Sequence, residues 1–274
     1  MTTVGIATGV GRGTGEACAK RLVDMVDVLL LADRSEAAAA AVAKDLSGHG
    51  GSTAVEPLGV DVTDRDDLAR LAGRVSELGT LRAVAHAENV PPEEADWRRI
   101  LEVDFVSAAL VAEVLRPLAT VGTAFVYFAS VSPLIAHIDP DPAVAAVLDT
   151  ALEGDFLARL RDAIGPAVED SAWAYPWATY GVHRLARAEA VRLGPTGARA
   201  CSVSPGAIDT PETRMEAARY ESVRQLIRRT PLSRTGRCEE VAAVAAFLLS
   251  DEASFVNGVD IVVDGGLYAA VQDD

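Results

Sequence analysis

The chain has 274 residues, of which 50% are hydrophobic but only 5% aromatic, so its core is built mainly from Ala, Val and Leu side chains. Its 40 acidic residues outnumber the 25 basic ones, and this net charge of −15 excludes nucleic acid and anionic membranes as partners because both would be repelled. The three cysteines are far apart and no apolar run reaches the roughly 18 residues of a membrane span, so we expect a cytoplasmic protein with a small-molecule substrate.

Short apolar strand segments alternate with amphipathic helical segments along the whole chain. The predicted strands are Val4–Ala7, Val28–Leu31, Thr53–Leu58, Ala83–His86, Thr123–Phe128, Ala198–Val203 and Asp260–Val263. The predicted helices are Gly13–Val23, Glu36–Leu46, Asp64–Leu78, Pro92–Leu115, Trp173–Leu193 and Glu239–Leu249. This alternation predicts an α/β fold, a doubly wound Rossmann-type parallel sheet of seven strands in a single domain over residues 1–274.

One segment interrupts the alternation after the fifth predicted strand. Residues 134–172 show no strand pattern, and Pro140 and Pro142 precede a run of spaced leucines. This pattern predicts a helical insertion, with a turn followed by one or two short amphipathic helices. Because open α/β sheets bind ligands at the carboxyl ends of their strands, we expect the insertion to form a lid or a subunit contact; the alternative is an inert surface decoration.

A glycine-rich loop, TGVGRGTG, separates the first predicted strand from the first helix. Glycines let the backbone approach a pyrophosphate closely, and the following helix N-terminus offers free N–H groups and the positive end of its dipole. The loop therefore predicts a dinucleotide phosphate site rather than a flexible turn. The residues that we assign to it are Thr8, Gly9, Arg12, Gly13 and Gly15.

The nucleotide preference is predicted at the end of the second strand, where Asp33 follows an unbroken apolar run. A carboxylate there accepts hydrogen bonds from the adenosine ribose and repels a 2′-phosphate, which predicts NAD as the cofactor rather than NADP. Arg12 and Arg34 are opposing signals, since either could hold a phosphate. Asp61 and Val62 follow the third strand and are candidates for contacting the adenine, although Asp61 could also be a helix cap.

Taken together, these residues resemble the short-chain dehydrogenase/reductase family over essentially the whole chain. The resemblance rests on the TGxxxGxG pattern of the loop, Ser130 within FASVS, Ser204-Pro205-Gly206, Asp209-Thr210-Pro211 and Val263-Asp264-Gly265-Gly266. It implies hydride transfer between a nicotinamide and a carbonyl or alcohol carbon, in a homotetramer or homodimer. The helical insertion resembles that of the bacterial 3α-hydroxysteroid dehydrogenase-like branch.

The resemblance also extends the list of expected contacts. It implies that Pro211–Arg229 forms a mobile pair of helices that covers the substrate. Thr210 matches the position that binds the nicotinamide carboxamide. The further dinucleotide contacts that it implies are Ala87, Pro205, Gly206, Ile208 and Thr210.

The family's catalytic Ser and Tyr are matched here, but its Lys is not. Ser130 matches the Ser, and Tyr175 matches the Tyr when the following helix is aligned without a gap. The Lys position, four residues later, is then Thr179. Tyr180 is the second candidate for the Tyr, and it would place Arg184 at that position. The chain's two lysines, Lys20 and Lys44, both lie on predicted helices of its first half.

Two further positions differ from the family pattern. The family's Asn-Ala-Gly after the fourth strand reads His86-Ala87-Glu88, and the Asn on the next helix is replaced by Asp104. Without the Lys, the pKa of the Tyr stays near about 10 or above, which costs alcohol oxidation roughly a hundred- to thousand-fold. An ionised Glu88 near the Tyr would raise that pKa further. The rate of ketone reduction is lowered less, because reduction uses the neutral Tyr as the acid.

We therefore expect an NAD(H)-dependent oxidoreductase acting on an apolar cyclic, polyketide-like or steroid-like ketone or alcohol, with Ser130, Tyr175, Thr179, Glu88 and Asp104 as the catalytic-site residues. One alternative is non-redox isomerisation, elimination or cyclisation on the same fold, with Glu88, Tyr175 or His86 as the acid or base. Another is a pseudoenzyme. No metal site is expected, since His49 and His137 lack ligand companions at useful spacing. Trp173 and Trp177 are predicted to belong to the core or to the pocket wall.

Overall fold

The core of the fold is a parallel sheet of seven strands in the order β3-β2-β1-β4-β5-β6-β7. The computed structural model describes residues 1–47 and 52–272, so the loop predicted around His49 lies outside the described residues. The strands are β1 (Thr3–Thr8), β2 (Val28–Asp33), β3 (Ala54–Gly59), β4 (Thr80–His86), β5 (Ala124–Phe128), β6 (Arg199–Pro205) and β7 (Asp260–Val263). The predicted doubly wound α/β fold is confirmed. Its strand order reverses between β1 and β4, and ligands bind at such a switch point.

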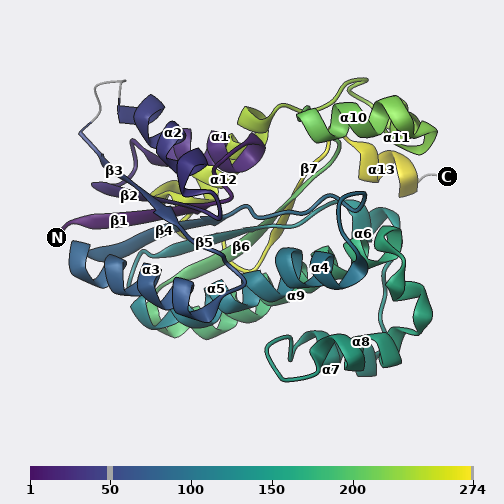
Figure 1. Cartoon of the computed structure of the whole chain (residues 1–274), viewed down its shortest axis with the longest axis horizontal. Coiled ribbons are helices and arrows are strands. Elements are labelled where there is room, and N and C mark those ends of the chain that lie inside the picture. The colour runs from purple at the N-terminus through teal and green to yellow at the C-terminus, as the bar shows by residue number, and fades with distance from the viewer. Residues whose placement is uncertain (48–51, 273–274) are drawn as a thin grey trace.

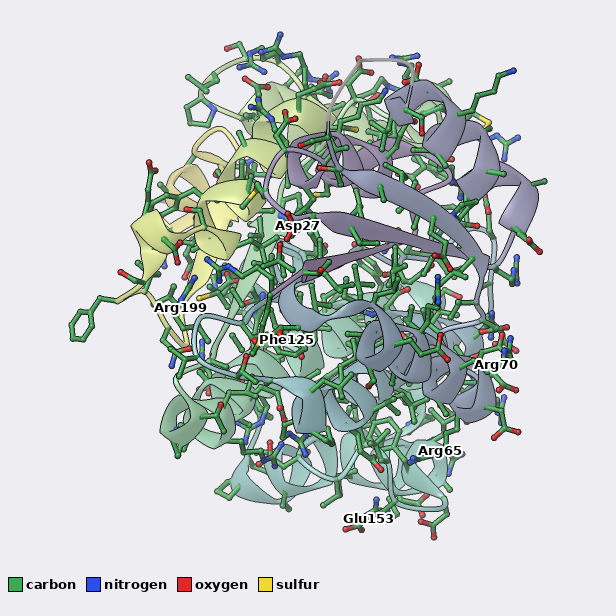
Figure 2. The ribbon with its side chains drawn as sticks, turned by 90° about the vertical axis from the view of Figure 1, so that its left-hand side faces the viewer. Asp27, Arg65, Arg70, Phe125, Glu153 and Arg199 are labelled. Carbon is green, nitrogen blue, oxygen red and sulfur yellow. The ribbon has the colours of Figure 1, made fainter. Side chains whose placement is uncertain are left out.

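Helices cover both faces of this sheet. On one face lie α1 (Gly13–Leu22), α2 (Glu36–Ser47) and α12 (Cys238–Leu249), and on the other α3 (Arg65–Leu78), α4 (Trp97–Leu101), α5 (Ser107–Leu115) and α9 (Ser171–Leu193) (Figure 1). Successive strand residues enter opposite cores: Ile6 packs on the α5 and α9 side, and Ala7 on the α1 and α12 side. Figure 2 shows Phe125 of β5 in the interior, with Arg70 and Glu153 at the periphery.

The prediction of a single helix over Pro92–Leu115 is wrong in two respects. It begins only at Trp97, because the Asp96 carboxylate caps it by accepting the N–H of Arg99 at 2.9 Å. A π-helical turn, η1 (Glu102–Val106), then separates α4 from α5. A π turn adds one residue to the helical repeat, which apolar periodicity does not reveal, and such turns are frequent at functional sites. Here the turn carries Asp104.

The helical insertion contains α6 (Ser132–Ile135), α7 (Pro142–Leu148), α8 (Phe156–Ile164) and the short 3₁₀ turn η3 (Pro166–Glu169). The two short helices predicted from the sequence are therefore α7 and α8. The ring of Phe156 packs edge-on against Phe105 with centroids 5.8 Å apart, and Leu160 is fully buried. In Figure 1 both helices lie beside α9, away from the edge of the sheet where α10 and α11 are seen.

The remaining elements follow β6 or connect larger ones. They are α10 (Pro211–Arg219), α11 (Glu221–Arg229), α13 (Leu267–Gln272), η2 (Arg116–Leu118), η4 (Gly194–Thr196) and η5 (Asp251–Ala253). The helix pair predicted within Pro211–Arg229 is thus present as α10 and α11. In the part of the chain that the structure describes, no helix combines the length and the apolar character that crossing a membrane would require.

Candidate active site

A cleft of about 890 Å³ runs along the carboxyl ends of the strands, with α10 and α11 over one end. Of the residues predicted to bind dinucleotide or substrate, all but Thr8 line it. Those lining residues are Gly9, Arg12, Gly13, Gly15, Asp33, Arg34, Asp61, Val62, Ala87, Glu88, Asp104, Ser130, Tyr175, Thr179, Pro205, Gly206, Ile208 and Thr210. Thr8 is fully buried behind the glycine loop. Residues 136–172 contribute nothing to the lining, so the lid expected from the insertion is wrong; α10 and α11 hold that position instead.

The glycine loop is packed too tightly for side chains. Gly9 has φ +64°, and a Cβ added to it would lie 2.7 Å from the carbonyl oxygen of Ala87. A Cβ on Gly15 would lie 2.0 Å from the carbonyl oxygen of Gly9. Arg12, the residue preceding α1, gives no side-chain hydrogen bond to the first turn, which leaves backbone N–H groups free at the cleft. This cradle fits the diphosphate of a dinucleotide.

At the end of β2, the Asp33 carboxylate is held at the cleft by two backbone donors. The N–H of Gly11 donates to its Oδ2 at 2.8 Å, and the N–H of Ser35 donates to its Oδ1 at 2.9 Å. Of the two competing arginines, Arg12 forms an ion pair with Glu212 at 2.7 Å, which leaves Arg34 on the cleft wall. The carboxylate thus occupies the position where a ribose-binding group is expected.

Asp61 lies at the same end of the cleft, after β3. Burial alone would raise its pKa, but the hydroxyl and the N–H of Thr63, which donate at 2.6 Å and 2.9 Å, outweigh burial and lower it. Asp61 is therefore a firmly ionised neighbour of Asp33 in this part of the cleft. It is Asp64, and not Asp61, that caps α3.

Glu88 points toward this same end. Its carboxyl accepts a hydrogen bond from the N–H of Gly9 and faces Asp33 and Asp61. Burial and the charge of Asp33 raise its pKa to about 7. The carboxyls with the main effects on the pKa of Tyr175 are Asp104 and Glu216, and an effect of Glu88 on it stays a prediction.

The hydroxyl groups of Ser130 and Tyr175 meet in a different part of the cleft. The Ser130 hydroxyl lowers the pKa of Tyr175 and itself donates to Ser132 Oγ at 3.0 Å, and Asn89 Nδ2 lies 3.4 Å from the Tyr175 hydroxyl. Burial and the charge of Asp104 raise the pKa of Tyr175 to about 12, against the lowering effect of these two partners. Tyr180 does not line the cleft, since its ring packs against Trp177 and His183. The structure therefore places Tyr175, and not Tyr180, beside Ser130.

Thr179 is uncharged, and its side chain is shorter than that of the Lys that the family has at this position. Its hydroxyl donates to the carbonyl oxygen of Tyr175, one turn earlier in α9, at 2.9 Å. This bond uses its only proton, so Thr179 offers the cleft an acceptor but no donor. Neither lysine of the chain lines the cleft, and both lie on the far face, on α1 and α2. The pKa of Tyr175 is therefore set without a neighbouring ammonium group.

Asp104 and Asn89 complete the surroundings of Tyr175. The N–H of Val90 donates to Asp104 Oδ1 at 2.8 Å, and Asn89 Nδ2 lies 3.4 Å from Asp104 Oδ2. Burial raises the pKa of Asp104 well above its ordinary value. The Asn89 amide thus links Asp104 to the Tyr175 hydroxyl. Sequence reasoning missed Asn89, although it directly follows the divergent His86-Ala87-Glu88 segment.

The alternative acid or base His86 lies outside the cleft. Its Nδ1 is 3.0 Å from the Thr8 hydroxyl and its Nε2 is 3.2 Å from the Ser107 hydroxyl. Burial lowers its pKa to about 4, so the ring is neutral. The prediction that His86 could act on a substrate is wrong. Trp173 and Trp177 do not line the cleft either, so they say nothing about the substrate.

Carboxyl groups gather where α10 meets the loop after β4. Glu93, Glu94, Glu212 and Glu216 all line the cleft there. Burial and a hydrogen bond with Glu93 raise the pKa of Glu216 to about 7. Glu216 also acts electrostatically on Tyr175, which places this acidic wall next to the reactive hydroxyl. Over residues 1–47 and 52–272, no three His, Cys, Asp or Glu side chains are arranged to hold a metal ion.

Comparison with known proteins gives consistent matches. The family profile described as "short chain dehydrogenase" matches residues 3–130, and that described as "Enoyl-(Acyl carrier protein) reductase" matches residues 163–268. The chain is 32% identical to a cis-4-hydroxycyclohexanecarboxylate dehydrogenase of Sinomonas cyclohexanicum, over 98% of this chain and 97% of that protein. It is 30% identical to a cyclohexanol dehydrogenase of Acinetobacter sp., over 96% and 93% of the two chains.

Solved structures share the fold. A short-chain type dehydrogenase/reductase from Mycobacterium ulcerans superposes with a TM-score of 0.74 at 25% identity, covering 98% of this chain and 90% of that one. The RhlG/NADP active-site complex of Pseudomonas aeruginosa superposes with a TM-score of 0.73 at 22% identity, covering 97% and 96% of the two chains. The second likeness shows the fold alone.

Proposed function

The chain belongs to the short-chain dehydrogenase/reductase family of oxidoreductases, and we propose that it interconverts a neutral cyclic alcohol and the corresponding ketone with NAD(H) as its cofactor. The observation that carries this proposal is one continuous cleft. It has the glycine cradle and Asp33 at one end and the paired hydroxyls of Ser130 and Tyr175 at the other. A bound nicotinamide would supply the hydride acceptor or donor in such a cleft.

The chain's own residues supply the proton chemistry. Ser130 is placed to hold the substrate oxygen, and Tyr175 to give that oxygen a proton in reduction or to take one in oxidation. Asn89 fixes the Tyr175 hydroxyl from the side. Since the pKa of Tyr175 is about 12, its neutral form dominates at pH 7, which favours ketone reduction.

NAD is proposed over NADP on electrostatic grounds. Asp33, Asp61 and Glu88 lie at the end of the cleft that would hold the adenosine; Arg34 acts electrostatically on Glu88 and Asp61, and Arg99 acts on Asp61. A 2′-phosphate there would meet three carboxyl groups. Glu88 lies with this set, so it is assigned to the dinucleotide and not to acid–base work on a substrate.

The proposed substrate class follows from the relatives and from the acidic wall. Two relatives are named for cyclohexane-ring alcohols, one neutral and one carrying a carboxylate. The wall formed by Glu93, Glu94, Glu212 and Glu216 would repel an anion next to Tyr175. We therefore propose a neutral ring substrate. The family assembly as a homodimer or homotetramer, and the likeness to the 3α-hydroxysteroid dehydrogenase-like branch, stay predictions from the resemblance.

The proposal is tested by mixing purified protein with NADH and a panel of cyclic ketones, cyclohexanone first, and following nicotinamide absorbance. Oxidation of NADH in step with alcohol formation supports it. Binding of NADH without any turnover on the panel would instead favour the non-redox or pseudoenzyme alternatives.

The acidic wall predicts discrimination by substrate charge. We expect kcat/KM for cyclohexanol to exceed that for cis-4-hydroxycyclohexanecarboxylate by about tenfold or more, because each like-charge contact costs roughly 1 kcal/mol or more in a partly buried site. Glu216→Gln should narrow this ratio, and the surface variant Glu252→Gln should not change it. A carboxylate substrate that reacts as well as cyclohexanol would contradict the assignment of the wall to the substrate.

The raised pKa of Tyr175 predicts an unusual pH dependence. Oxidation needs the tyrosinate, whose fraction rises about tenfold per pH unit at every pH below about 12. At saturating dinucleotide, kcat/KM for the alcohol should therefore climb without a plateau from pH 8 to pH 10, above the range in which Glu88 and Glu216 titrate. Ketone reduction should stay nearly flat over the same range. A plateau in oxidation below pH 9 would show that the pKa of the base is not raised.

A further inference from the structure

Glu88 occupies a position in the dinucleotide cleft that is hard to reconcile with an anionic ligand. Its carboxyl accepts the N–H of Gly9, at the centre of the glycine cradle. The backbone there is tightly packed, since a Cβ on Gly9 would lie 2.7 Å from the carbonyl oxygen of Ala87 and 3.3 Å from the N of Glu88. Glu88 therefore lines the cleft beside the very loop whose N–H groups fit a diphosphate.

The charged groups that face Glu88 come from three parts of the chain. Asp33 ends β2, Asp61 follows β3, Arg34 follows Asp33, and Asp104 lies in η1. The Asp33 carboxyl accepts two backbone N–H donors, and the bonds from Thr63 lower the pKa of Asp61. Burial raises the pKa of Asp104 well above its ordinary value.

Glu88 itself titrates near neutrality. Burial and the charge of Asp33 raise its pKa to about 7, and the N–H of Gly9 opposes the shift. A bound diphosphate would add two negative charges and displace water from the same part of the cleft. Both effects favour the uncharged carboxyl.

We propose that Glu88 determines dinucleotide affinity by its charge state, so that the dinucleotide binds with the Glu88 carboxyl protonated and binding takes up one proton. This inference rests on the proposed function, because it requires a nicotinamide dinucleotide in the cleft. Linkage makes the effect reciprocal: protonation strengthens binding by the same factor by which binding strengthens protonation.

The test is the Kd of NADH, measured by fluorescence of the full chain between pH 6 and pH 9. NADH is the right probe because it lacks the 2′-phosphate of NADPH, which would itself titrate. We expect the wild-type Kd to be nearly constant below pH 7 and to rise about tenfold per pH unit above it, about 30-fold in all from pH 6 to pH 8.5. Calorimetry at pH 8 in two buffers of different ionisation enthalpy should report uptake of close to one proton.

Two variants remove the negative charge of Glu88. Glu88→Gln keeps an acceptor for the N–H of Gly9, and Glu88→Gly removes the side chain; both should bind NADH with a Kd that changes less than about threefold over the pH range. Glu252→Gln, the same chemical change on an exposed 3₁₀ turn, should keep the wild-type slope. Each variant is checked by its thermal melting curve. The proton uptake of the wild type needs no variant, so it remains decisive if a variant does not fold.

The outcomes separate the two proposals. A wild-type Kd that is independent of pH, or a Glu88→Gln variant that keeps the slope, would overturn the role of Glu88 and leave the oxidoreductase intact. Absence of NADH binding by the wild type at every pH would overturn the proposed function, and this inference with it.

Discussion

Replacing Tyr175 by Phe is expected to lower kcat/KM about a thousandfold in both directions while leaving the Kd of NADH within about threefold of wild type. The substitution removes one oxygen, and with it the cleft hydroxyl whose pKa Ser130 and Asn89 both lower. The ring stays in place, so α9 keeps its packing. What is lost is the proton donor or acceptor for the substrate oxygen, and positioned proton transfer contributes about a hundred- to ten-thousand-fold.

The matched control for this experiment is Tyr180→Phe. Tyr180 lies on the same helix and carries the same hydroxyl, but it packs against Trp177 and His183 outside the cleft. We expect it to retain more than about half of the wild-type kcat/KM. Equal losses in the two variants would mean that the effect is structural. A Tyr175→Phe variant of wild-type activity would remove Tyr175 from the chemistry altogether.

Much of the site could be predicted because it depends on backbone conformation and chain order. Asp33 ends a strand of the parallel sheet, and three other parts of the site follow strands: the glycine loop, Ser130 and Thr210. Parallel strands have their carboxyl ends at one edge of the sheet. The order of strands and helices along the chain therefore places these residues in one cleft. Tyr175 came from a gapless alignment of one helix, and helical spacing alone separated it from Tyr180.

The parts that could not be predicted depend on tertiary contacts. The π turn that carries Asp104 differs from an α-helix by one residue, which no pattern of apolar residues records. The direction of the Glu88 side chain is decided by the N–H of Gly9 and by charges from other strands. The contact between Glu216 and Glu93 joins α10 to the loop after β4, two segments with no relation in sequence.

The features that the sequence did not predict all affect the charge state of the cleft. Burial and neighbouring carboxyls raise the pKa of Glu88, Asp104, Glu216 and Tyr175, and no lysine in the described part of the chain opposes them in the cleft. A site of this kind holds its protons near pH 7. It is therefore suited to give a proton to a ketone, and it is poorly suited to take one from an alcohol.

Placing a cation at position 179, where the family has its Lys, should reverse this preference for ketone reduction over alcohol oxidation. Thr179→Lys is expected to raise kcat/KM for alcohol oxidation at pH 8 about a hundredfold, because an ammonium group within about 4–6 Å lowers the pKa of a phenol by one to three units. Thr179 lies one helical turn after Tyr175 and lines the cleft, so an unbranched side chain there can extend toward the hydroxyl. Asp104 and Glu216, which act electrostatically on Tyr175, would also stabilise the ammonium.

The control for this gain is Thr179→Met, which has a similar unbranched chain and no charge. It tests whether added bulk or the loss of the Thr179 hydroxyl bond to the carbonyl oxygen of Tyr175 changes the rate. We expect the Met variant to show no gain and the oxidation profile of the Lys variant to begin levelling off at about pH 10, where the wild type still climbs. If both variants behave alike, or if the Lys variant gains rate without a shifted profile, the pKa of Tyr175 is not what limits oxidation in this cleft. A shifted profile without a gain would place the limit in a later step, such as release of the product.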